Sequence, residues 1–167
     1  MEQKNSFDLN SVKVYRNTEA KIFEMVFAIL AIIVWGIIIW LVHRAPDIIP
    51  THFDASGKPN DYGPAAGIMI PCAIITIVAI GAMITAYFPK SINMPYKITN
   101  IRQVEYAIRG IRVAGITLLI VCLAIAYTLL GMESPNATPV LATVILLIVE
   151  LLVFSILGHK ATKGHYS

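Results

Sequence analysis

The sequence predicts an all-α, polytopic membrane protein with four transmembrane helices. Of the 167 residues, 57% are hydrophobic and only 14% are charged, whereas soluble domains average about 45–50% apolar and about 25% charged residues. Four apolar segments are each long enough to cross a bilayer, which takes about 20 residues. This composition argues against a soluble enzyme, a nucleic-acid-binding protein and a disordered chain.

The predicted transmembrane segments are separated by more polar connections. They run from about Ile22 to Val42, from Ala65 to Phe88, from Ile111 to Met132, and from Pro139 to Leu157. A polar cytoplasmic tail is expected over residues 1–17 and a single transmembrane domain over residues 18–167. Asn17 and Thr18 are candidate caps for the first helix.

Lysine and arginine are distributed very unevenly over the polar segments. The two tails and the second loop hold eleven of the 13 basic residues, the first loop holds Arg44 and Lys58, and the third loop holds none. Because cytoplasmic segments are enriched in lysine and arginine, we expect both termini in the cytoplasm. The first and third loops should then lie outside.

The second loop predicts an amphipathic inner segment over residues 100–110. Asn100 followed by Gln103 approximates a capping box, so the third helix should begin near Ile101. Glu105 and Arg109 are four residues apart, in the order that favours an ion pair. Anionic lipid headgroups could hold this basic helix start. Alternatively, a cytoplasmic regulator could dock on its basic side chains, Arg102, Arg109 and Arg112.

The first outer loop, residues 43–63, is long for a connection between two helices. Its prolines exclude a helix, because proline fixes φ and removes a backbone donor. The segment from Asp54 to Gly57 is typical of a turn. Ile48, Ile49 and Phe53 are apolar, and we expect them to press the loop onto the helix ends. The sequence therefore predicts a structured extracytoplasmic cap.

His52 and Asp54 lie two residues apart, so their side chains point the same way if the segment is extended. Together with Asp61, or with His43, they could bind a metal ion. Alternatively, they could tie the loop together by hydrogen-bonding backbone groups that the prolines leave without partners. No candidate nucleophile and no cofactor motif accompanies them. We therefore expect no enzyme and no cofactor other than a possible metal ion.

Glu150 is an ionisable residue within the fourth apolar segment. A charge inside the bilayer costs at least about 2.5 kcal/mol, so such residues are functional candidates by default. A protonated glutamate that hydrogen-bonds across helices is the structural alternative. Arg112 and Thr76 are candidate partners by depth. The face that points into the bundle is expected to carry the neighbouring small and polar residues, Ala142, Thr143, Leu146 and Gly158.

The outer loop also resembles a known signature. Ile49-Pro50-Thr51-His52-Phe53, followed by Asp54, Gly57, Pro59, Asn60 and Asp61, is similar to the pattern Ile-Pro-x-His-Phe…Gly-x-Pro-Asp. That pattern is typical of the bacterial membrane-protein family related to the toxin-immunity protein SdpI. Asn60 stands where the family usually has aspartate, and Asp61 follows it.

The resemblance implies a multi-pass protein of the bacterial cytoplasmic membrane with an immunity or signalling function. The outer loop would contact a secreted peptide or an envelope component, and the inner basic segment a cytoplasmic regulator. Residue chemistry alone favours a different function, a small-solute, proton or metal transporter that uses Glu150 and the His52 loop. Assembly into a homo-oligomer is compatible with either function.

Overall fold

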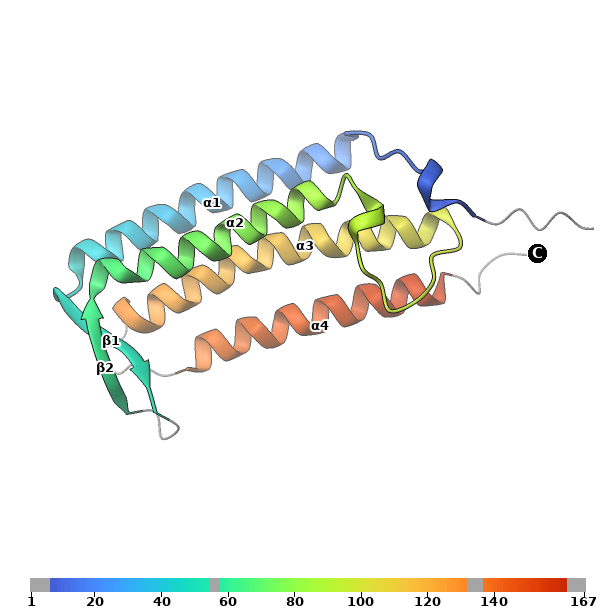
Figure 1. The fold of residues 1–167 in the computed structure, drawn as a ribbon. Helices are drawn as coiled ribbons and strands as arrows, with labels where there is room; N and C mark the ends of the chain where they lie inside the picture. Colours follow the sequence, from blue (N-terminus) through green and yellow to red (C-terminus); the bar gives the residue numbers. More distant parts are fainter. Residues whose placement is uncertain (1–6, 55–57, 132–136, 162–167) are drawn as a thin grey trace, which may run out of the picture.

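Four long helices dominate the computed structural model, which describes residues 7–54, 58–131 and 137–161 (Figure 1). The helices are α1 (Thr18–Arg44), α2 (Met69–Thr85), α3 (Ile101–Ala126) and α4 (Thr138–Lys160). A 3₁₀ turn, η2 (Ala65–Ile68), precedes α2, and a π-helical turn, η4 (Tyr127–Gly131), extends α3. Within the described residues, four helices are long and apolar enough to span a membrane, which confirms the four predicted segments.

Helix α3 is the central element of the bundle. In its most apolar stretch of 18 residues, half of the residues are buried. The buried share of the corresponding stretch is 17% for α1, 22% for α2 and zero for α4. Helices α1 and α2 both pack on α3, whereas α4 lies along another side of α3 (Figure 1). The outward faces of α1, α2 and α4 are covered with exposed isoleucine, leucine and valine side chains. Such surfaces suit contact with lipid, because a bilayer solvates apolar side chains.

The apolar core lies where α1, α2 and α3 meet. Val34, Ile38 and Leu119 are fully buried there, together with the free cysteines Cys72 and Cys122. The two cysteines therefore occupy the positions of small buried hydrophobes.

Side-chain caps fix the starts of α1 and α3. Asn17 accepts a 2.8 Å hydrogen bond from the backbone N–H of Ala20, and Asn100 accepts one of 3.1 Å from the N–H of Gln103. The side chain of Gln103 in turn accepts a 2.6 Å bond from the N–H of Thr99. The capping arrangement is thus reciprocal, although it reaches one residue further back than a standard capping box. Helix α3 begins at Ile101, as predicted.

A β-hairpin connects α1 to α2. Strand β1 (Ile48–Phe53) pairs antiparallel with β2 (Pro59–Pro64), and the register is irregular around His52. The all-α prediction omitted this small sheet. Two of the prolines are the first and last residues of β2, positions where a strand tolerates the missing donor.

The hairpin and the chain termini lie at opposite ends of the bundle (Figure 1). The end near the termini also holds the connection between α2 and α3, with its short 3₁₀ turn η3 (Pro89–Ser91). Another 3₁₀ turn, η1 (Leu9–Ser11), lies in the N-terminal segment. There Phe7, Leu9, Val12 and Val14 pack against a cluster that contains Val104 and Ile108 of α3. The described part of the predicted tail is therefore anchored to the start of α3.

Candidate functional site

The hairpin is held together by its own polar side chains. His52 Nδ1 lies 2.5 Å from Asn60 Oδ1, a hydrogen bond that joins β1 to β2 and in which the imidazole donates, because an amide oxygen only accepts. At the closed end, Asp54 accepts a 3.0 Å bond from the N–H of Lys58 and donates its own N–H to the Lys58 carbonyl. Asp61 accepts from the N–H of Tyr62 at 2.9 Å. These contacts favour the interpretation that His52 and Asp54 tie the loop together.

Only part of the predicted apolar contact between the hairpin and the helices is present. Ile49 is buried, with 3% of its surface exposed, and Phe53 is half-buried. Ile48 is 58% exposed, so the expectation that it presses on the helix ends is wrong. Successive residues of a strand point to opposite faces, which explains why Ile49 is covered and its neighbour is not. Strand β1 lies against the η4 turn, so the hairpin is seated on the end of α3.

The predicted metal ligands do not gather into a metal centre. No three histidine, cysteine, aspartate or glutamate side chains come together as possible ligands anywhere in residues 7–54, 58–131 and 137–161. Within the hairpin, His52, Asp54 and Asp61 each make one of the hydrogen bonds described above. His43 belongs to α1, where its Nδ1 lies 3.0 Å from the Ile39 carbonyl oxygen. Gly57 of the motif lies outside the described residues.

Glu150 is held by a neighbour that the sequence did not single out as its partner. Thr117 Oγ1 donates a 2.8 Å hydrogen bond to Glu150 Oε2, and this bond links α3 to α4. The other carboxyl oxygen, Oε1, is buried and has no hydrogen-bond partner among the described residues. The predicted partners are engaged elsewhere. Thr76 accepts from Trp35 Nε1 and donates to the Cys72 carbonyl, and Arg112 lies against aromatic rings.

The inward face of α4 differs from the predicted one. Thr143 and Gly158 do point toward the bundle, as expected. Ala142 and Leu146 are exposed instead. The half-buried Leu147 and Phe154 take their place, and with Glu150 they follow the i, i+3 and i+7 spacing of one helix face. The prediction was wrong here because Ala142 and Leu146 follow the i±4 row through Glu150, which winds away from the face that contacts α3.

The inner basic segment is paired within the chain. Arg109 Nε and Nη2 donate to the two carboxyl oxygens of Glu19, at 2.7 and 3.1 Å. Arg109 therefore bonds to a residue of α1 rather than to Glu105, the partner that the helical spacing indicated. Arg112 is buried, with 4% of its surface exposed, whereas Arg102 is exposed and the Arg109 side chain stays 42% exposed beside Glu19.

A second ion pair lies close to the first. Arg16 Nη2 lies 2.5 Å from Glu24 Oε2, and the Tyr87 hydroxyl also donates to the Glu24 carboxylate. Burial, together with the bond to Glu24, holds the pKa of the Tyr87 phenol above its usual value of 10.0. These partners could not be predicted from the sequence, because each contact joins residues from different elements.

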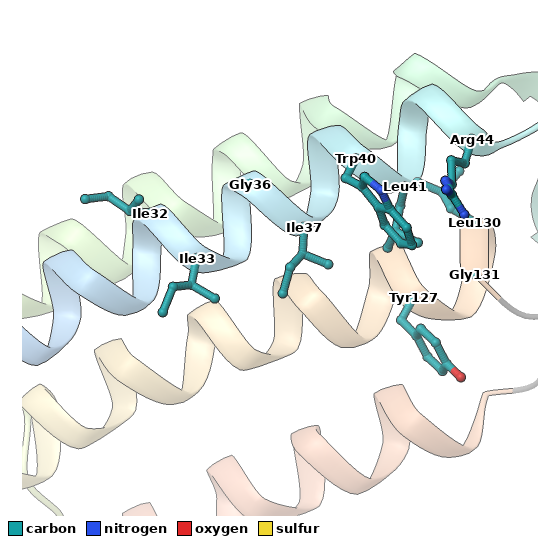
Figure 2. A pocket seen from close by; sticks show the side chains of 10 residues that line it. All are labelled: Ile32, Ile33, Gly36, Ile37, Trp40, Leu41, Arg44, Tyr127, Leu130 and Gly131. Atoms are coloured by element: carbon teal, nitrogen blue, oxygen red, sulfur yellow. The ribbon is translucent and has the colours of Figure 1, made fainter.

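A wide apolar hollow lies between α1 and the η4 turn (Figure 2). Its volume is about 810 Å³. Isoleucines of α1 line one part, and Trp40, Arg44 and Tyr127 line the part nearer the hairpin. The Arg44 guanidinium lies 4.7 Å from the centre of the Trp40 ring. Aromatic and basic side chains together are typical of a membrane–water interface.

Comparison with known proteins finds a family model that matches part of the chain. Residues 29–76 match the family model described as a domain of unknown function (DUF1648). The match covers much of α1, the whole hairpin, and the beginning of α2. No curated protein and no solved structure matches the chain. The four apolar helices indicate an integral, multi-pass membrane protein, and around its hairpin the chain is similar to a domain whose function is unknown.

Proposed function

We propose that the chain is a non-enzymatic protein of the bacterial cytoplasmic membrane with an immunity or signalling function. In this proposal its hairpin contacts a secreted peptide or an envelope component. The observation that carries the proposal is the hairpin itself. Its motif residues form a self-supporting, exposed structure at one end of an otherwise apolar bundle.

The hairpin has the features of a recognition surface. Tyr62 is 59% exposed on β2, and tyrosine is enriched among the residues that dominate binding energies. Thr51, His52, Asn60 and Asp61 are exposed beside it and offer hydrogen-bonding groups. A two-stranded sheet also has free strand edges, to which an extended peptide can add by backbone hydrogen bonding.

Orientation is the second part of the proposal. At the hairpin end the described basic residues are Arg44 and Lys58, whereas the end near the termini carries Lys13, Arg16, Lys90, Arg102 and several others. The preference of basic residues for the cytoplasm then puts the hairpin outside and both termini inside. Arg102 remains available to a cytoplasmic regulator, while Arg109 is held by Glu19.

Cysteine labelling tests the orientation. The native Cys72 and Cys122 are fully buried, so their background labelling should be low. Lys58→Cys should react with a membrane-impermeant maleimide in intact cells. The matched variant Lys90→Cys should react only after the cells are permeabilised. Labelling of Lys90→Cys alone in intact cells would reverse the proposed orientation.

A protection assay tests the function. A strain without the gene is challenged with the peptides that its parent strain secretes, and survival is compared with and without complementation. We expect the wild-type chain to restore survival and Tyr62→Ala, at equal membrane level, to fail. Arg102→Ala tests the inner signalling step by itself, because this substitution leaves the hairpin unchanged. Equal survival of the deletion strain and its parent would exclude the immunity function.

Proton coupling through Glu150 is a second candidate function. The observation that favours it is the buried Glu150 Oε1, which lacks a hydrogen-bond partner among the described residues. In proteoliposomes with an internal pH dye, the wild-type chain should then conduct protons and Glu150→Gln should not. Equal fluxes through both proteins would exclude this candidate.

A further inference from the structure

Arg112 is buried at the inner end of the bundle, and two of its guanidinium nitrogens have no hydrogen-bond partner among the described residues. Its side chain is 4% exposed, and its Nε and Nη2 atoms are buried and unpaired within the part of the chain that the structure describes. Its guanidinium faces two aromatic rings, 5.8 Å from the centre of Phe23 and 5.4 Å from that of Tyr87. A guanidinium has five N–H donors, so this environment leaves most of its bonding capacity unused.

The nearest carboxylates are already engaged with other cations. Glu19 accepts from Arg109 through both oxygens, and Glu24 accepts from Arg16 and from Tyr87. The cluster around them contains four basic side chains, Lys13, Arg16, Arg109 and Arg112, and three acidic ones, Glu19, Glu24 and Glu105. It therefore carries one positive charge in excess. Arg112 interacts with the Glu19 and Glu24 carboxylates by charge alone. Because a buried guanidinium with unused donors is costly, a bound anion would be favoured here.

A pocket adjoins this unpaired charge. It has a volume of about 280 Å³ and lies between the N-terminal segment around Val12–Asn17 and the first turns of α3. Arg112 and Arg109 line it from α3, and Lys13 lines it from the N-terminal segment. Glu19 and Glu105 also line it, and the Glu19 carboxylate is neutralised by Arg109.

We propose that this pocket binds one phosphate-bearing anion, held by Arg112 inside the pocket and by Lys13 at its rim. A guanidinium matches the geometry of phosphate oxygens, with two parallel N–H donors. A phosphodiester carries a single negative charge, which equals the excess positive charge of the cluster. The ring of Tyr87, two residues beyond the end of α2, places Arg112 near the level where lipid headgroups begin. The phosphate can therefore come from an anionic lipid or from free solute.

The lipid arm of the test counts bound lipids by native mass spectrometry. The full chain is exchanged into a neutral detergent and supplied with phosphatidylglycerol or phosphatidylcholine. We expect the wild-type protein to retain one phosphatidylglycerol. Arg112→Gln should bind it about tenfold more weakly, because the variant loses a charge-assisted hydrogen bond. Arg102→Gln, which removes an exposed charge from the same helix, should bind like the wild type.

The free-phosphate arm uses the same proteins without lipid. Inorganic phosphate should raise the thermal unfolding temperature of the wild type and of Arg102→Gln at constant ionic strength, but not that of Arg112→Gln. A response to phosphate without retention of phosphatidylglycerol would support a solute as the natural source. Retention of phosphatidylglycerol would support a lipid.

A second variant keeps the test decisive if Arg112→Gln does not fold, as judged by circular dichroism. Lys13 is exposed where it lines the pocket. Lys13→Gln should fold and should bind the same anion several-fold more weakly. The proposal is overturned if Lys13→Gln and folded Arg112→Gln bind both probes like the wild type, or if the wild type binds neither.

Discussion

Thr117 Oγ1 lies 2.8 Å from Glu150 Oε2 and connects α3 to α4 by a hydrogen bond inside the apolar bundle. The other polar links between these helices lie at their inner ends. There Gln103 Nε2 donates to the Gly158 carbonyl at 3.2 Å, and Asn100 Nδ2 donates to the Ala161 carbonyl at 3.3 Å. Helices in a bilayer associate without a hydrophobic driving force, so close packing and a few such bonds hold α4 in place.

Thr117→Val should therefore weaken the attachment of α4. The variant keeps the shape of the side chain but removes the only group that bonds to Glu150 within the described residues. We expect a loss of about 1 kcal/mol in the free energy of unfolding, the order measured for hydrogen bonds between membrane helices. Reversible unfolding in mixed micelles measures this change.

A matched pair of controls separates the bond from the packing. Thr117→Ser retains the hydroxyl group but deletes a methyl group at a site that is 3% exposed, so its cost reports the loss of packing without loss of the bond. In the background Glu150→Leu, Thr117→Val should cost less than it does in the wild type, because the acceptor is already gone. An equal cost in both backgrounds would show that the bond does not contribute to stability.

Close approach of α3 and α4 depends on Gly110. A Cβ atom added at Gly110 would lie 3.0 Å from Cβ of Phe154, whereas one added at Gly81 of α2 would meet nothing within 4 Å. Gly110→Leu should therefore overpack the interface and cost about 1–3 kcal/mol or more. Gly81→Leu should be neutral or stabilising, because glycine disfavours a helix by about 1 kcal/mol. The two unfolding temperatures, measured in one detergent, should shift in opposite directions or by clearly different amounts.

The helices could be predicted from the sequence because their cause is local. Apolar runs of sufficient length and the caps at Asn17 and Asn100 act within a few residues, and α3 begins at Ile101 as expected. The hairpin strands escaped prediction because β1 contains Pro50 and lacks regular alternation. For this segment the sequence could exclude a helix but could not establish a strand pairing.

The side-chain partners could not be predicted because they depend on how each helix is rotated. Glu105 precedes Arg109 by four residues, yet Arg109 bonds to Glu19, which lies 90 residues away in the chain. Depth alone suggested Arg112 and Thr76 as partners of Glu150. The packing of α3 against α4 presents Thr117 to it instead. The same packing also decides which basic residues remain exposed. A local sequence pattern could not predict this either.

Tyr87 should titrate at higher pH than an ordinary tyrosine. Burial of the phenol and its bond to Glu24 raise its pKa above 10.0. Because the folded chain retains this proton more tightly than the unfolded chain, the stabilisation is complete below pH about 10. It is lost as the pH rises through the folded-state pKa. Ultraviolet titration of the wild type minus Tyr87→Phe isolates this group, and a difference curve centred at or below pH 10 would contradict the expectation.

The hairpin should depend on the bond between His52 and Asn60, which joins its two strands across an exposed face. His52→Ala and Asn60→Ala should each raise the rate of proteolytic cleavage in the hairpin, because either change removes the cross-strand link. The double variant should be cleaved no faster than the more labile single one, since the link can be removed only once. Asn60→Asp, which supplies the aspartate of the resembled signature, keeps an acceptor opposite the imidazole and should be cleaved at the wild-type rate. Additive effects of the two alanine substitutions would show that His52 and Asn60 stabilise the hairpin through separate contacts.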